Sequence, residues 1–175
     1  MRYLSLFSGA GGGDLACSHL LGWHCIGYVE WDDYCQQLIA RRIKDGHLDK
    51  APIYSDIRAF ASEGYANMYQ GLVDTVIGGF PCQPFSSAGE ARGADDPRNM
   101  WPATRDVLCA VRPRWALLEN VSGLLAGGSD GYFGTILRDL HTLGFDVRWQ
   151  VLSAKEVGAP HQRERLWIVA HANGQ

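Results

Sequence analysis

One cysteine in this chain stands in a setting that a purely structural thiol does not require. Cys82 lies between two prolines in the segment Gly78-Gly79-Phe80-Pro81-Cys82-Gln83-Pro84-Phe85-Ser86, which follows the mostly apolar run 73–77. The prolines fix the backbone beside the thiol, and the two glycines permit a sharp bend after a buried strand. A stiff loop at the end of such a strand would present one side chain outward. Cys82 is therefore a candidate nucleophile.

A second group of residues follows strand-like segments and could hold a nucleoside. Phe7-Ser8-Gly9-Ala10-Gly11-Gly12-Gly13 opens a predicted helix, whose first backbone N–H groups can face a ligand. The dinucleotide pattern G-x-G-x-x-G is incomplete, because Asp14 stands at its third glycine. After the next two predicted strands, Glu30 could accept hydrogen bonds from ribose hydroxyls, Trp31 could stack on a flat ring, and Asp56 could meet an exocyclic amine. Each feature alone can be structural, but together they favour an adenosine-type cofactor over a dinucleotide.

Two further polar groups could act on a substrate. Glu119 follows the apolar run 116–118, and a carboxyl in such surroundings can stay protonated or transfer a proton. A helix N-terminal charge or a salt bridge is the alternative explanation. Arg163 and Arg165 would lie on one side of an extended segment, where guanidinium groups suit phosphate or substrate. A solvated strand edge is the alternative for this pair.

The elements that must position these residues alternate between strand and helix. Strands are predicted over residues 3–7, 25–29, 53–54, 73–77, 115–118, 147–152 and 166–170. Helices are predicted over about 13–21, from a cap at Asp32 or Asp33 to about 44, and over about 100–111 and 130–143. The polar stretch 86–98 is predicted to be a mobile loop. This alternation predicts an α/β fold, a doubly wound and mostly parallel sheet, in a single domain over residues 1–175.

Composition narrows the classes of protein. The cysteines are odd in number and form no C-x-x-C pair, which argues against a disulfide framework or a zinc site and favours a reducing cytoplasm. No apolar run reaches the roughly 18 residues of a membrane span, and the N-terminus does not resemble a signal peptide. The net charge of −3 permits nucleic-acid binding without indicating it.

The motifs taken together resemble the DNA (cytosine-5)-methyltransferase family. The matching residues follow the order and spacing of that family over residues 3–170 and are Phe7-Ser8-Gly9-Ala10-Gly11-Gly12, Glu30-Trp31, Asp56-Ile57, Pro81-Cys82-Gln83, Glu119-Asn120-Val121 and Gln162-Arg163-Glu164-Arg165. The resemblance implies a Rossmann-like S-adenosylmethionine-dependent methyltransferase fold with an antiparallel final strand. It also implies a bacterial or phage-encoded protein of the restriction-modification type.

The resemblance further implies a role for each motif. Cys82 would add to carbon 6 of a cytosine flipped out of double-stranded DNA, and carbon 5 would then take the methyl group of S-adenosylmethionine. Glu119 would bind the base, and Arg163 and Arg165 would orient it. Residues implied to contact the cofactor are Phe7, Gly9, Gly11, Glu30, Trp31, Asp56, Ile57, Pro81 and Met100, and those implied to contact DNA are Gln83, Ser86 and Ser87.

The family also has segments that this sequence does not show. Its members continue with a target-recognition domain and a returning segment that packs on the sheet, whereas this sequence ends shortly after Arg165. We therefore expect an apolar face that a second chain or self-association would cover. Two alternatives stay open: an inactive or split-enzyme fragment that acts as a cofactor-binding or regulatory module, and an RNA cytosine methyltransferase.

Overall fold

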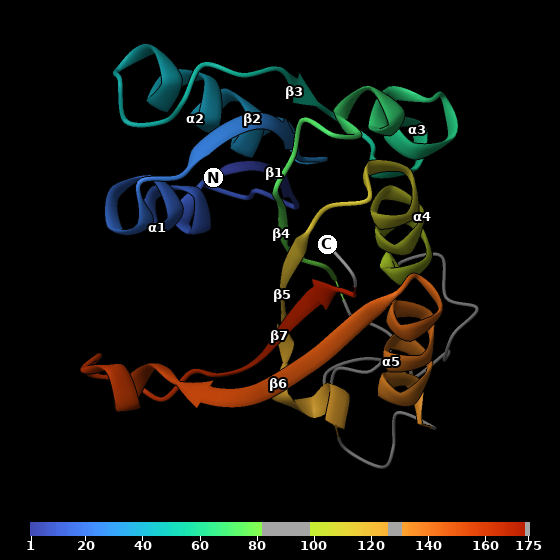
Figure 1. The fold of residues 1–175 in the computed structure, drawn as a ribbon. Coiled ribbons are helices and arrows are strands. Elements are labelled where there is room, and N and C mark those ends of the chain that lie inside the picture. The colour runs from blue at the N-terminus through green and yellow to red at the C-terminus, as the bar shows by residue number, and fades with distance from the viewer. Residues whose placement is uncertain (82–98, 126–130, 174–175) are drawn as a thin grey trace.

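A computed structural model describes residues 1–81, 99–125 and 131–173 of the chain (Figure 1). Cys82, Gln83, Ser86 and Ser87 lie outside the described residues, as does the predicted mobile loop 86–98. None of the helices within the described ranges is both long enough and apolar enough to cross a bilayer.

The centre of the fold is one seven-stranded sheet with the order β3-β2-β1-β4-β5-β7-β6. Its strands are β1 Arg2–Leu6, β2 His24–Val29, β3 Ile53–Tyr54, β4 Thr75–Gly79, β5 Trp115–Val121, β6 Phe145–Ser153 and β7 Glu164–Ala172. β1 to β5 pair in parallel, and β7 runs antiparallel to both of its neighbours. The predicted doubly wound, mostly parallel sheet with an antiparallel final strand is confirmed.

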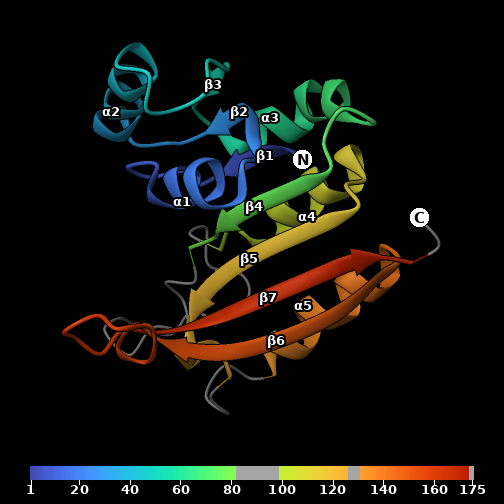
Figure 2. The same ribbon diagram turned by 60° about the vertical axis from the view of Figure 1, so that its left-hand side comes forward.

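Helices lie on both faces of the sheet. α1 Gly12–Leu21 and α2 Asp33–Lys44 lie on one face, while α3 Ile57–Ser62, α4 Trp101–Val111 and α5 Tyr132–Thr142 lie on the other (Figures 1 and 2). Short 3-10 helices are η1 Tyr65–Tyr69, η4 Ser122–Leu125 and η6 Ala154–Val157. The larger apolar core lies beneath α4 and α5, where Leu118, Ile168 and Ala170 are fully buried.

The opposite face of β5 and β7 is less covered. Side chains alternate along a strand, so Leu117, Trp167 and Val169 point away from the α4–α5 core. Trp167 and Val169 are 37% and 40% exposed, and Figure 1 shows no described helix over this part of the sheet. The structure therefore leaves an apolar surface beside α1.

Three sequence-based expectations differ from the structure. α3 was not predicted, although Asp56 caps it by accepting a hydrogen bond from the Arg58 backbone N–H at 2.8 Å. The predicted Gly78-Gly79 bend is wrong, because both glycines belong to β4 and neither has a left-handed backbone. Glu119 lies inside β5 and not after it, because pairing with β7 continues to Val121.

Candidate active site

The carboxyl ends of four adjacent parallel strands bring most of the predicted cofactor residues to one edge of the sheet. Phe7, Gly9 and Gly11 follow β1, and Glu30 follows β2. Asp56 follows β3, and Pro81 follows β4. These strands are neighbours in the order β3-β2-β1-β4, so the four loops share one rim of the sheet. Ligands of open α/β sheets bind outside this rim.

The glycine-rich loop after β1 has a backbone that few residues adopt. Phe7, Gly9 and Gly11 have φ values of 52°, 53° and 74°. A left-handed conformation costs a non-glycine residue such as Phe7 about 1–2 kcal/mol, so other contacts must hold the loop. The Ser8 hydroxyl donates to the Ser5 hydroxyl at 2.9 Å, and the Gly11 N–H donates to the Ser8 carbonyl at 2.8 Å.

Glu30 holds the same loop from the end of β2. Its Oε2 accepts a hydrogen bond from the Gly9 backbone N–H at 2.6 Å, and its Oε1 accepts one from the Asp32 N–H at 2.8 Å. The carboxylate is buried and links the glycine-rich loop to the start of α2, where Asp32 is the N-cap. Each carboxylate oxygen has a second lone pair, so Glu30 can still accept from a ligand hydroxyl.

The other predicted cofactor residues have different surroundings. Trp31 is 72% exposed beside Glu30, whereas Ile57 is buried in the first turn of α3. Asp56 is half-buried and caps α3, as described above. Met100 is half-buried, precedes α4 and packs against the core, so it stands on the α4 side of the sheet.

Sequence reasoning missed two residues that support the glycine-rich loop. The Arg42 guanidinium, near the end of α2, donates a hydrogen bond to the Ala10 carbonyl. Leu48 packs against the same loop, because a Cβ added to Gly11 would lie 3.0 Å from Leu48 Cδ1. No sequence pattern signals these contacts, since they depend on how α2 packs beside β1.

Asn120 positions the chain just before the cysteine. Its side chain is 2% exposed, and its Nδ2 donates to the Phe80 carbonyl at 2.9 Å. Its Oδ1 accepts from the Val121 backbone N–H at 2.9 Å. Phe80 is also buried, with its ring 5.3 Å from that of Trp101. The β4 end that leads to Pro81 and Cys82 is thus anchored to β5 and α4.

Glu119 and Arg165 form an ion pair across β5 and β7. Arg165 Nε lies 2.8 Å from Glu119 Oε1, and the two side chains are 24% and 28% exposed. Arg165 Nη1 also donates to the Glu164 carbonyl at 2.8 Å. The salt bridge that the sequence offered as the alternative for Glu119 is therefore present, and it joins two of the predicted catalytic residues.

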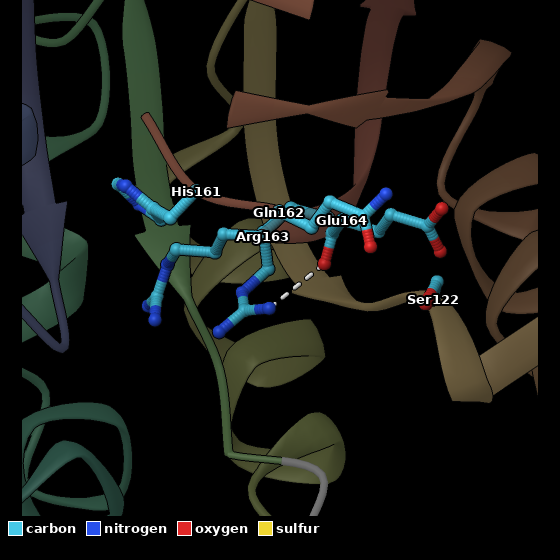
Figure 3. A pocket seen from close by; sticks show the side chains of 6 residues that line it. Ser122, His161, Gln162, Arg163 and Glu164 are labelled. Atoms are coloured by element: carbon cyan, nitrogen blue, oxygen red, sulfur yellow. Dashed lines mark hydrogen bonds between the residues drawn. The ribbon is translucent and has the colours of Figure 1, made fainter. Parts of the chain in front are cut away.

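Two cavities adjoin this ion pair. One of about 530 Å³ lies at the start of β7 and is lined by Ser122, His161, Gln162, Arg163, Glu164 and Arg165 (Figure 3). In Figure 3 the side chains of Arg163 and Glu164 extend in opposite directions. A larger cavity of about 680 Å³ lies between α1 and β7, and Phe7, Gly79, Glu119, Arg163 and Arg165 all contribute to its lining. Both arginines thus line the same two cavities.

The sheet order, the antiparallel β7 and the glycine-rich loop after β1 are those of the Rossmann-like fold of S-adenosylmethionine-dependent methyltransferases. The family described as C-5 cytosine-specific DNA methylase matches residues 1–175. The chain therefore belongs to the C-5 cytosine-specific DNA methylase family.

Curated relatives are type II methyltransferases. The chain is 32% identical to M.BsuFI of Bacillus subtilis over 97% of its own length and 39% of that protein. It is 33% identical to M.NgoPII of Neisseria gonorrhoeae, covering 97% of the chain and 47% of the relative. It is 32% identical to M.AquIA of Picosynechococcus, covering 99% and 73%. The chain thus spans less than half the length of the first two relatives.

Solved structures share the fold. A mutant DNMT2 of Spodoptera frugiperda has a TM-score of 0.76 and 22% identity, covering 99% of this chain and 50% of that one. The Entamoeba histolytica methyltransferase EhMeth has a TM-score of 0.74 and 19% identity, covering 98% and 52%.

Proposed function

We propose that this chain transfers a methyl group from S-adenosylmethionine to carbon 5 of cytosine in DNA, through a covalent adduct with Cys82. The observation that carries the proposal is the Glu119–Arg165 pair beside the end of β4. Gly79 and Glu119 are register partners on adjacent strands, and Cys82 comes three residues after Gly79 in the sequence. A carboxylate and a guanidinium from adjacent strands, with a thiol that follows closely in the sequence, suit one small planar substrate.

The residues at the sheet edge fit a nucleoside cofactor. Glu30 keeps acceptor capacity beside the glycine-rich loop, Trp31 offers an exposed ring, and no side chain caps the start of α1. We assign ribose contacts to Glu30 and ring stacking to Trp31. Phe7, Gly9, Gly11, Asp56, Ile57, Pro81 and Met100 complete the proposed contacts. When bound, S-adenosylmethionine supplies an electrophilic methyl group on a sulfonium.

The chemistry follows from the poor nucleophilicity of cytosine at carbon 5. The Cys82 thiolate forms a bond to carbon 6, and the electron pair of the 5,6 double bond moves toward the ring nitrogen that Glu119 contacts. Carbon 5 would then take the methyl group, while the electron pair of the broken sulfonium–methyl bond would stay on the cofactor sulfur as a neutral thioether. A base would remove the proton from carbon 5, and the freed electron pair would restore the 5,6 double bond as the bond between Cys82 Sγ and carbon 6 breaks to release the thiolate. Arg165 holds the Glu119 carboxylate during these steps, and Arg163 contacts the substrate.

The proposal is tested by trapping on duplex DNA in which 5-fluorocytosine replaces cytosine. Fluorine cannot leave carbon 5 as a proton does, so the adduct with Cys82 should persist and migrate as a protein–DNA band in denaturing gels. Cys82→Ser should form no such band, because serine is a far weaker nucleophile. Cys109→Ser is the matched control, since Cys109 is an exposed thiol on α4, and it should trap as well as wild type.

Other results would overturn the assignment. Trapping by Cys82→Ser at the wild-type level would exclude Cys82 as the nucleophile. A band with 5-fluorocytosine RNA and none with DNA would favour an RNA substrate. No band with either, in the presence of S-adenosylmethionine, would favour a cofactor-binding module.

We also propose that the apolar face beside α1 is covered by a further polypeptide, and that the isolated chain self-associates through it. Leu20, Leu21, Val157 and Trp167 line the larger cavity and are 81%, 54%, 76% and 37% exposed. Exposed apolar patches of this kind mark interaction surfaces.

Gln83, Ser86 and Ser87 are proposed to contact DNA on the side of the cysteine loop.

Sedimentation velocity tests this surface. Wild type should sediment increasingly as a dimer or larger species as concentration rises, and Trp167→Lys should stay monomeric because a lysine charge opposes burial. Met68→Lys is the control, because Met68 is 66% exposed in η1, away from this face. A wild type that stays monomeric throughout, or equal behaviour of both variants, would contradict the proposal.

A further inference from the structure

The second glycine of the Gly78-Gly79 pair is not required for backbone freedom. Gly79 is the last residue of β4, and its φ lies outside the left-handed region that favours glycine. Any residue could adopt this extended backbone. A different reason must account for the missing side chain.

The space above Gly79 is occupied by the side chain of Glu119. A Cβ built on Gly79 would lie 2.9 Å from Glu119 Oε2 and 3.8 Å from Glu119 Cδ. The other carboxylate oxygen, Oε1, lies 2.8 Å from Arg165 Nε. Glu119 is therefore placed between a guanidinium from β7 and the bare backbone of β4.

We infer that Gly79 is a positioning residue for Glu119, because the absence of its side chain determines where the carboxylate rests. This inference rests on the proposed function, in which Glu119 binds the cytosine. An alanine at position 79 would force Glu119 Oε2 to move away, since 2.9 Å is shorter than a carbon and an oxygen can approach without a hydrogen bond. The carboxylate is at the free end of a flexible side chain, so it can move without disturbing the core.

Gly78 provides the contrast. A Cβ on Gly78 would lie 3.0 Å from the Leu6 carbonyl oxygen and 3.1 Å from Leu6 Cβ. These atoms belong to the adjacent strand and cannot move aside alone, so alanine at position 78 should lower stability by overpacking. Alanine at position 79 should instead displace the Glu119 carboxylate and leave the stability of the chain nearly unchanged.

The experiment compares Gly79→Ala, Gly78→Ala and Gly134→Ala in the full chain. Gly134 lies in α5, where a Cβ would meet nothing within 4 Å, so Gly134→Ala is the matched control. We measure kcat, KM for DNA, the Kd of S-adenosylmethionine and the urea midpoint. We also measure the carboxyl carbon resonance of Glu119, which is assigned by its loss in Glu119→Gln.

Gly79→Ala should lower kcat about thirtyfold, because a small displacement of a catalytic group has a large kinetic cost. The Kd of S-adenosylmethionine and the urea midpoint should match those of wild type, and the Glu119 resonance should shift only in Gly79→Ala. An unchanged resonance, or a loss of kcat that parallels a loss of stability as in Gly78→Ala, would overturn the inference. A shifted resonance in a chain without methyl transfer would support the positioning role and overturn the proposed function.

Discussion

Glu119→Gln is expected to lower kcat for methyl transfer by about a thousandfold, a typical loss for a preorganised group that stabilises developing charge. Glutamine keeps the length of the side chain but cannot share a proton with the base or balance the Arg165 guanidinium. The Glu119 carboxyl group therefore matters most when electron density moves onto the cytosine ring, because it can share a proton with the ring nitrogen. The rate of methyl incorporation from labelled S-adenosylmethionine, at saturating DNA, gives the measurement.

The same variant should fold normally and bind the cofactor. The Glu119–Arg165 pair is roughly a quarter exposed at each end, and pairs this accessible contribute about 1 kcal/mol or less to stability. The Kd of S-adenosylmethionine should stay within about twofold, since Glu30 and the glycine-rich loop make the proposed cofactor contacts. Glu63→Gln is the control, because Glu63 is an exposed carboxylate that follows α3. Retention of more than about a tenth of wild-type kcat by Glu119→Gln would exclude the proposed role.

Asp14→Asn is expected to raise the stability of the folded chain at neutral pH. Asp14 lies in the first turn of α1, is 1% exposed, and its Oδ1 has no hydrogen-bond partner among the described residues. Burial raises the pKa of Asp14 from its ordinary value of 3.8 to about 6, although the Ser5 and Tyr3 hydroxyls oppose the shift. At pH 8 the folded chain must therefore keep a buried carboxylate charged.

The pH dependence follows from that direction of the pKa shift. Between about pH 4 and 6 the folded state holds the Asp14 proton while the unfolded state has lost it, so wild-type stability falls as pH rises through this window. A shift of about 2 pKa units corresponds to ~3 kcal/mol. Asparagine carries no charge at any pH. Asp14→Asn should therefore match wild type near pH 4 and exceed it by up to ~3 kcal/mol above pH 6.

Urea unfolding of both proteins at several values between pH 4 and 8 gives the measurement. The difference between the two free energies of unfolding cancels the titration of all other groups that they share. Asp106→Asn is the control, because the Asp106 side chain is 54% exposed on α4, and its difference from wild type should not change across this range. Parallel stability curves for wild type and Asp14→Asn would contradict the prediction.

The strands and most helices could be predicted from the sequence because they depend on patterns of neighbouring residues. The alternation of apolar strands with helical segments predicted six of the strands nearly in place, and β3 with its stated bounds. α3 was missed because its six residues are too few to show a helical period. The glycine pair at 78–79 was misinterpreted because a glycine needed for a sharp bend and a glycine needed to leave space for a neighbouring side chain look the same in the sequence.

The residue types at the strand ends, read in order, identified the family and led to the proposed chemistry, because each motif consists of neighbours in the chain. Only the tertiary structure decided which residues meet. Arg165 reaches Glu119 because β7 pairs with β5 in antiparallel register. Arg42 reaches the glycine-rich loop because α2 packs beside β1. Asp14 is shielded from solvent because its side of α1 is buried. Such contacts join distant segments through strand order and helix packing, which no local pattern of residues encodes.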